Sequence, residues 1–154
     1  MREIKFKGKL INKYAEEWFY GDLIQVKDGT VDKKGNPAID YYIITDDYSS
    51  KYNKIELRTC QSPKVNADTI GQYTGLKDKN GVEIYEGDIV KINNDYEKYG
   101  INAGEIYQVY FKSGGYRLLP KYCKEALGYW LESGEDFVVI GNVWDNPELL
   151  KEGD

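Results

Sequence analysis

Residues 69–90, TIGQYTGLKDKNGVEIYEGDIV, form the most clearly patterned segment of the chain. Asn80-Gly81 stands at its centre, and this dipeptide is typical of tight hairpin turns because both residues tolerate positive φ. Short apolar runs lie on both sides of the dipeptide, and EIYEGDIV continues the pattern. The segment therefore predicts a β-hairpin followed closely by another strand.

The composition favours β structure in the rest of the chain as well. The sequence holds 15 Tyr, 3 Trp and 4 Phe but only one Met, and Tyr, Ile and Val dominate its apolar runs. Sixteen Gly residues provide frequent turns. Strands are predicted over residues 4–11, 18–26, 38–45, 88–92, 105–111 and 136–143. A loop rich in turn formers is predicted over 28–37, and Pro147 is placed as in the first turn of a short terminal helix.

These strands are predicted to form two parts. Residues 61–68 contain Pro63 and little periodicity, so we place the boundary there, between a β region at 1–67 and a second part at 68–154. About five short strands in the second part, within roughly 80 residues, favour a small closed barrel over an open sheet.

The sequence excludes much familiar enzyme chemistry. Its 154 residues include 21 Lys and Arg, 26 Asp and Glu and no His, for a net charge of −5. Without His there is no Ser-His-Asp triad, Cys-His pair or His-ligated metal. Cys60 and Cys123 allow one disulfide at most and leave open whether they pair. No Gly-rich phosphate loop is present. We therefore expect no enzyme, cofactor or metal, with a carboxylate-dependent hydrolase as an open alternative.

The amino end and the short apolar runs indicate a compartment. MREIKFKGKL is charged throughout and lacks the apolar core of a signal peptide. The longest apolar stretches, such as FVVI at 137–140, are too short to span a bilayer. We expect a cytoplasmic protein without a membrane partner.

Several segments together resemble the YopX family of phage and prophage proteins. Residues 69–90 carry the main resemblance, supported by MREIKFKGK, by Trp18 with YGDL at 20–23, by GE at 104–105 with VYF at 109–111, and by VIGNVWDNPELL at 139–150. The resemblance implies an SH3-like small barrel in the C-terminal part. We expect the N-terminal β segment to pack on this barrel and a short helix to follow it. It also implies a phage or prophage origin and a life in the cytoplasm of a bacterial host. It implies no activity and no site residues.

Several acidic residues are candidates for a site. Asp22 and Asp88 each follow a Gly and precede an apolar pair, so they could bind Mg²⁺ or act as a base if they came together. Asp78 begins a run that is similar to part of a calcium loop but lacks its helical context. We interpret the Gly-Asp pairs as one kind of turn used twice, and the run at Asp78 as a hairpin with solvated carboxylates.

Aromatic residues provide the predicted interaction surface, which consists of Trp18, Tyr20, Tyr73, Tyr85 and Trp144. Residues 70–147 hold 8 basic and 12 acidic side chains, so this part repels phosphate, whereas residues 1–69 hold 12 and 11. We therefore predict a non-enzymatic module that binds a host or phage protein, with self-association into a homo-oligomer possible. The alternative is a nucleic-acid-associated factor of the phage early or replication region that uses the basic amino end and the aromatics.

Overall fold

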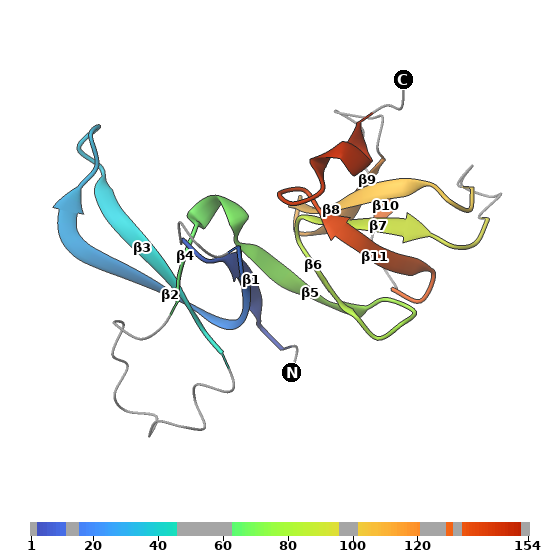
Figure 1. The fold of residues 1–154 in the computed structure, drawn as a ribbon, viewed down its shortest axis with the longest axis horizontal. Helices are drawn as coiled ribbons and strands as arrows, with labels where there is room; N and C mark the ends of the chain where they lie inside the picture. Colours follow the sequence, from blue (N-terminus) through green and yellow to red (C-terminus); the bar gives the residue numbers. More distant parts are fainter. Residues whose placement is uncertain are drawn as a thin grey trace. The chain divides into compact units, whose positions relative to one another are not determined.

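The structure, a computed structural model, describes residues 3–11, 16–45, 63–95, 102–120, 129–130 and 134–151 (Figure 1). The chain divides into two compact units: an N-terminal unit over Glu3–Gln72 and a C-terminal unit that begins at Tyr73. Antiparallel strands dominate both units, which confirms the predicted mainly β class. The domain boundary placed between residues 67 and 68 stays a prediction. Cys60 and Cys123 lie outside the described residues.

The N-terminal unit is an antiparallel sheet in which the strands run in the order β4-β3-β2-β1-β5. Its elements are β1 (Phe6–Lys9), β2 (Trp18–Val31), β3 (Pro37–Ile44), β4 (Lys64–Val65), the 3-10 turn η1 (Ala67–Thr69) and the start of β5 (Gly71–Lys77). Strand β2 changes its neighbour along its length. Its first four residues, from Trp18 to Gly21, pair with β1, and the residues from Asp22 onward pair with β3.

The hairpin of β2 and β3 is longer than the sequence predicts. A loop was expected over residues 28–37, but β2 continues to Val31 and leaves only residues 32–36 as the turn. A register shift between Lys27 and Val31 accounts for the turn-forming residues inside the strand. The Asp32 carboxylate organises the turn, because its Oδ1 accepts the N–H groups of Lys34 at 2.8 Å and Asn36 at 2.9 Å.

The C-terminal unit contains the predicted hairpin at Asn80-Gly81. Strands β5 and β6 (Glu83–Tyr85) pair on either side of it, with Lys77 opposite Glu83, so this prediction is confirmed. The Gly81 N–H donates to the carbonyl of Asp78 at 2.9 Å, and Gly81 adopts a φ of +83°. Asn80 does not adopt positive φ. The turn is therefore not the tight hairpin turn in which both central residues have positive φ.

Beyond this hairpin the C-terminal unit forms a five-stranded sheet in the order β10-β9-β8-β7-β11. Its elements are β6 (Glu83–Tyr85), β7 (Asp88–Ile92), β8 (Ile106–Lys112), β9 (Gly115–Pro120), β10 (Tyr129–Trp130), β11 (Phe137–Asn142) and the 3-10 turn η3 (Pro147–Leu150). The predicted closed barrel is not confirmed, because no pairing joins β10 to β11 within the described strands. A single 3-10 turn stands where a short terminal helix was predicted.

Alternate residues of the central strands build the core of the C-terminal unit. Val90 and Ile92 of β7 point inward with Tyr107 and Val109 of β8, as the two-residue period of a strand requires. The buried core consists of Ile84, Val90, Ile92, Tyr107, Val109, Tyr116, Leu118 and Phe137. This core holds the β5–β6 hairpin and β11 in place, and most of the candidate acidic residues lie around it.

Candidate interaction surface

Tyr73 and Tyr85 are buried in the C-terminal unit. Their side chains are 5% and 2% exposed, and they face each other across β5 and β6 with ring centroids 5.4 Å apart. Buried rings cannot contact a partner, so their assignment to an interaction surface is corrected. Tyrosine is amphipathic, and its place on the inner or outer face of a strand is not visible in its residue type.

Trp18 and Tyr20 lie on β2 in the N-terminal unit, where they form part of a mixed basic and aromatic face. Lys9 is directly opposite Trp18, and Lys7 is directly opposite Tyr20. Directly opposed residues and alternate residues of a strand share a face, so these four side chains lie together. The Lys7 Nζ lies 5.0 Å from the centroid of the Trp18 ring, which is a cation–π contact. We call these four residues the basic–aromatic face.

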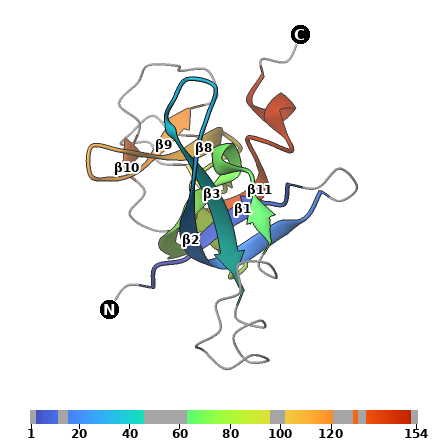
Figure 2. The same cartoon turned by 90° about the vertical axis from the view of Figure 1, so that its left-hand side faces the viewer.

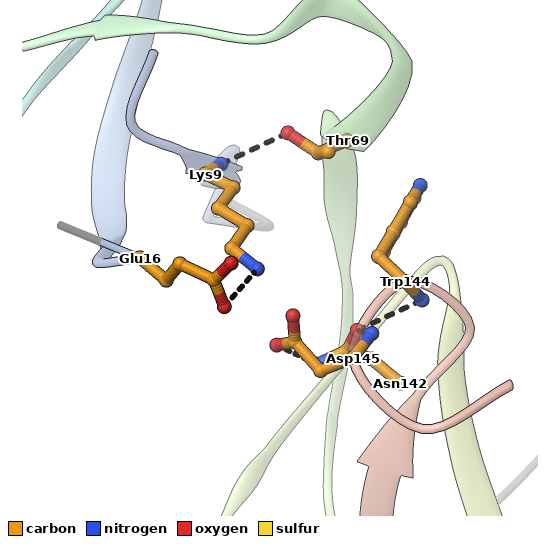
Figure 3. Close-up of polar contacts among 6 residues, drawn as sticks. All are labelled: Lys9, Glu16, Thr69, Asn142, Trp144 and Asp145. Carbon is orange, nitrogen blue, oxygen red and sulfur yellow. Dashed lines mark hydrogen bonds and ion pairs between the residues drawn. The ribbon is translucent and has the colours of Figure 1, made fainter. Parts of the chain in front are cut away.

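Much of the positive charge on the basic–aromatic face is already engaged. Lys7 is only 3% exposed, although Tyr20 beside it is 45% exposed. The Lys9 Nζ lies 3.1 Å from Glu16, and the backbone N–H of Lys9 donates to the Thr69 hydroxyl at 2.9 Å (Figure 3). The face therefore offers an exposed ring with limited free positive charge.

Trp144 has a structural role in the turn that follows β11. A Cβ placed on Gly87 would come within 2.1 Å of Trp144 Cη2, so the indole lies against the turn between β6 and β7. The Asn142 Oδ1 accepts the backbone N–H groups of Trp144 at 3.0 Å and Asp145 at 2.9 Å (Figure 3). These bonds fix the backbone that carries the indole, and the Trp144 side chain is left half-buried.

The two Gly-Asp pairs do different things. Asp88 is buried, and its Oδ2 accepts the Tyr85 N–H at 2.7 Å, which confirms its interpretation as turn chemistry. Gly21 instead lies inside β2, where an added Cβ would approach the carbonyl oxygen of Ile44 to 1.9 Å. Asp22 after it is exposed. The prediction that both pairs form the same turn is wrong, because one is within a strand and the other between two strands.

Asp78 joins the β5–β6 turn to β11. Its Oδ1 accepts the N–H groups of Asn80 at 2.7 Å and Val82 at 2.9 Å, and its Oδ2 accepts that of Val139 at 3.0 Å. Burial acts to raise the pKa of Asp78, but the hydrogen bonds from Val139, Val82 and Asn80 together lower it. Asp78 is 5% exposed, so the prediction of a solvated carboxylate is wrong here.

Metal binding finds no support in the part of the chain that the structure describes. No group of three or more Cys, Asp or Glu residues in it could hold an ion. Both oxygens of Asp78 already accept backbone hydrogen bonds that stabilise the turn. Asp78 and Asp88 are therefore explained by the fold.

Paired Glu and Tyr side chains form a feature that the sequence analysis missed. Tyr107 donates its hydroxyl to Glu105 at 2.5 Å, and Tyr85 donates to Glu83 at 2.5 Å. In each pair the carboxylate stands two residues before the tyrosine in the sequence. The hydrogen bond from Tyr107, with others from Asn102, lowers the pKa of Glu105. The repeated triplet Glu-Ile-Tyr at 83–85 and 105–107 was the available signal.

The β2–β3 hairpin arm, residues 22–44, is the second feature that the sequence analysis missed. Its strands run side by side as a two-stranded ribbon (Figure 1, Figure 2). Within the described residues, β4 pairs with β3 at Tyr41 and Tyr42, near one end of the arm. Val31 near the tip is 63% exposed, and Ile39 is also exposed. The sequence contains no clear signal for the extra length, because only Val31 is apolar among residues 27–31.

The hairpin arm is unusual because it leaves apolar side chains only partly covered. Leu23, Ile24 and Val26 are half-buried, although each would gain from full burial. Two strands alone bury too little surface to be stable in water, and a third strand or another layer is normally required. The arm is thus the part of the N-terminal unit best suited to contact another molecule.

No helix within the described ranges combines the length and the apolar character needed to cross a membrane.

The comparisons with known proteins identify the family of this mainly β chain. The chain matches the family model described as YopX protein over residues 5–151, so it belongs to the YopX family. This confirms the resemblance inferred from residues 69–90. The crystal structure of protein EF1440 from Enterococcus faecalis is similar at 24% identity, with a TM-score of 0.47, and covers 98% of this chain and 100% of that one. No curated protein matches the chain.

Proposed function

We propose that this YopX-family protein is a non-enzymatic protein-interaction module of a phage or prophage. It acts in the cytoplasm of the bacterial host and binds a host or phage protein. The observation that carries the proposal is the hairpin arm. Val31 and Ile39 are exposed there, and β2 and β3 pair mainly with each other between Asp22 and Ile44. Exposed apolar side chains on such a ribbon suit contact with another protein.

The acidic residues support a non-enzymatic role. The sequence has no His, and Asp78 and Asp88 are both buried and engaged by backbone N–H groups. A general base or nucleophile must reach a substrate, and these carboxylates face the protein backbone instead. They are explained as residues that stabilise turns.

Affinity capture from induced host cells tests this function, with each lysate divided into nuclease-treated and untreated halves. We expect a defined protein partner that survives nuclease and is lost when Val31 and Ile39 are both replaced by Ser. The control is Val82→Ser, which removes an exposed apolar side chain of the C-terminal unit. Recovery of the bait alone, or of material that disappears with nuclease, would contradict the proposal.

Nucleic-acid association is the second candidate, and the basic–aromatic face is the observation that favours it. The exposed Tyr20 ring beside Lys7 and Trp18 offers a surface on which a base could stack. The ion pair of Lys9 with Glu16 counts against it. Binding to a single-stranded oligonucleotide that weakens with salt and is lost in Tyr20→Ala would favour this candidate over the first.

We also propose that the C-terminal unit is an SH3-like small barrel with a short helical end. The Lys79 N–H donates to the Phe137 carbonyl at 3.1 Å, and Asp78 accepts from Val139. These bonds bring the β5–β6 hairpin onto β11, as closure of a barrel requires. An experimental structure in which pairing completes the ring would support this architecture, and an open sheet would contradict it.

A further inference from the structure

Strand β2 has an edge that its neighbours cover only in part. Strand β1 pairs with this edge from Trp18 to Gly21 and begins at Phe6. Residues 3–5, the described residues before β1, take no part in that ladder. From Leu23 to Lys27, no strand of the described chain pairs with the edge that faces away from β3. The edge of β2 that β1 occupies therefore continues from Leu23 to Lys27 without a paired strand in the described chain.

The hydrogen-bond pattern shows which backbone groups this edge presents. On β3, the Ile43 N–H donates to the Pro63 carbonyl at 3.2 Å, so Ile43 points away from β2. Leu23 lies directly opposite Ile43, so this is a non-hydrogen-bonded pair and Leu23 also points its backbone groups outward. By strand alternation, Gln25 and Lys27 do the same.

An independent bond at the start of β2 agrees with this alternation. On the edge that β1 covers, the carbonyl of Glu17 accepts the N–H of Leu10 at 2.9 Å. Glu17, Leu23 and Gln25 are separated by even numbers of residues, so their backbone N–H and C=O groups point to the same edge of the strand. The free segment therefore presents N–H and C=O groups at every second residue, in line with those that already bind β1.

The side chains along this segment carry a recognisable pattern. Asp22 and Lys27 are exposed, carry opposite charges and lie five residues apart on opposite faces of the strand. Between them, Leu23, Ile24 and Val26 are half-buried. A strand laid along the edge would place one side chain opposite each of these residues. Charge complementarity then requires a basic residue opposite Asp22 and an acidic residue opposite Lys27.

We infer that this edge of β2 accepts an antiparallel strand from the partner protein. The occupant is an extended segment with the order acidic, apolar, any residue, apolar, apolar, basic, which runs from Lys27 to Asp22. Its main chain bonds to Leu23, Gln25 and Lys27, and its side chains extend the apolar cover of the arm. The inference rests on the proposed function and specifies how that function is performed.

Selection from a displayed library of random eight-residue peptides on the immobilised full chain tests the inference. The informative variant is Gln25→Pro, which removes an outward N–H but leaves the β2–β3 ladder intact, and Gln25→Thr is its matched control. We expect the charged and apolar pattern to be enriched at least about tenfold on the wild type and on Gln25→Thr, but not on Gln25→Pro. Peptides that bind all three proteins equally would overturn the inference.

A charge exchange provides a second test that does not depend on the folding of a proline variant. In the double variant Asp22→Lys with Lys27→Glu, the selected peptides should exchange their acidic and basic ends. Selected peptides with unchanged charges, no enrichment on the wild type, or oligonucleotide binding in place of peptide binding would each overturn strand addition.

The same variants separate this inference from the proposed function. If Gln25→Pro retains a nuclease-resistant partner in the capture experiment, protein binding stands and strand addition fails. If wild type captures no protein at all, the proposed function itself fails.

Discussion

Trp144 lies directly over Gly87. A Cβ built on Gly87 would approach Trp144 Cη2 to 2.1 Å, and Gly87 adopts a φ of +84° that favours glycine. The Val143 N–H donates to the Gly87 carbonyl at 2.9 Å, which adds a backbone bond to the ring contact. The two segments at 69–90 and 139–150, both part of the family pattern, therefore meet at this turn. The contact between Gly87 and Trp144 explains why one segment has a glycine and the other a tryptophan at these positions.

Replacement of Gly87 by Ala should destabilise the C-terminal unit strongly. The substitution combines an unfavourable φ with a steric clash, and we expect the free energy of unfolding to fall by about 2–4 kcal/mol. Urea denaturation measures this fall. In a Trp144→Ala background the clash is absent, so Gly87→Ala should cost only about 1 kcal/mol. Equal costs in both backgrounds would show that the indole does not pack on Gly87.

Replacement of Asp78 by Asn should also destabilise this unit. The amide cannot accept all three backbone N–H groups, and its own NH₂ would face one of them, so we expect a loss of about 2–3 kcal/mol. Chemical denaturation at neutral pH is the measurement. Glu148→Gln, a change of an exposed carboxylate in the same unit, serves as the control and should have little effect.

The stability supplied by Asp78 should depend on pH in one direction. Its pKa is lowered in the folded state, so its contribution is complete above the ordinary aspartate value of about 3.9 and is lost as the pH falls through the folded value. The difference in unfolding free energy between wild type and Asp78→Asn should therefore shrink below about pH 4. A constant difference from pH 7 to pH 3 would contradict this assignment.

Removal of the Tyr107 hydroxyl should change the titration of Glu105. The hydrogen bond from Tyr107 is the largest cause of the lowered pKa of Glu105, so Tyr107→Phe should raise that pKa toward its ordinary value. NMR titration of the Glu105 side chain measures the shift, and Tyr110→Phe on the same strand is the control. An unchanged Glu105 titration in Tyr107→Phe would refute the pairing.

Replacement of Gly21 by Ala should disrupt the start of the hairpin arm. The new Cβ would lie 1.9 Å from the carbonyl oxygen of Ile44, which forces β2 and β3 apart, so we expect a loss of about 3 kcal/mol. Amide hydrogen exchange on β3 should then be faster. Gly29→Ala is the matched control, because Gly29 has open space around it and should cost only about 1 kcal/mol. Similar exchange in the two variants would exclude the close approach at Gly21.

Local patterns in the sequence predicted the strands well where turn chemistry was decisive. Asn80-Gly81 correctly located a hairpin, because few dipeptides suit so tight a turn. The prediction of a loop from residue 28 was wrong, because Asp28 and Gly29 are common in loops but here belong to an irregular strand. Barrel closure depends on pairing between distant strands, and no local pattern records it.

The candidate surface was harder to predict, because it depends on which face of each strand is covered. Tyr73 and Tyr85 resemble Tyr20 in sequence context, yet they are buried while Tyr20 is exposed. Asp78 looked like an ordinary turn residue, and its bond to Val139 joins positions 61 residues apart. Long-range contacts of this kind decide both burial and charge state.

Open strand edges are also the places from which protein fibrils grow, so the hairpin arm poses a problem of colloidal stability. Its tip addresses this problem. Strand β3 begins at Pro37, which has no N–H to offer, and Lys33 and Lys34 at the turn are exposed and repel the same residues of another copy. Dense solutions of the chain are protected from stacking tip to tip, while the segment nearer β1 stays open to a foreign strand.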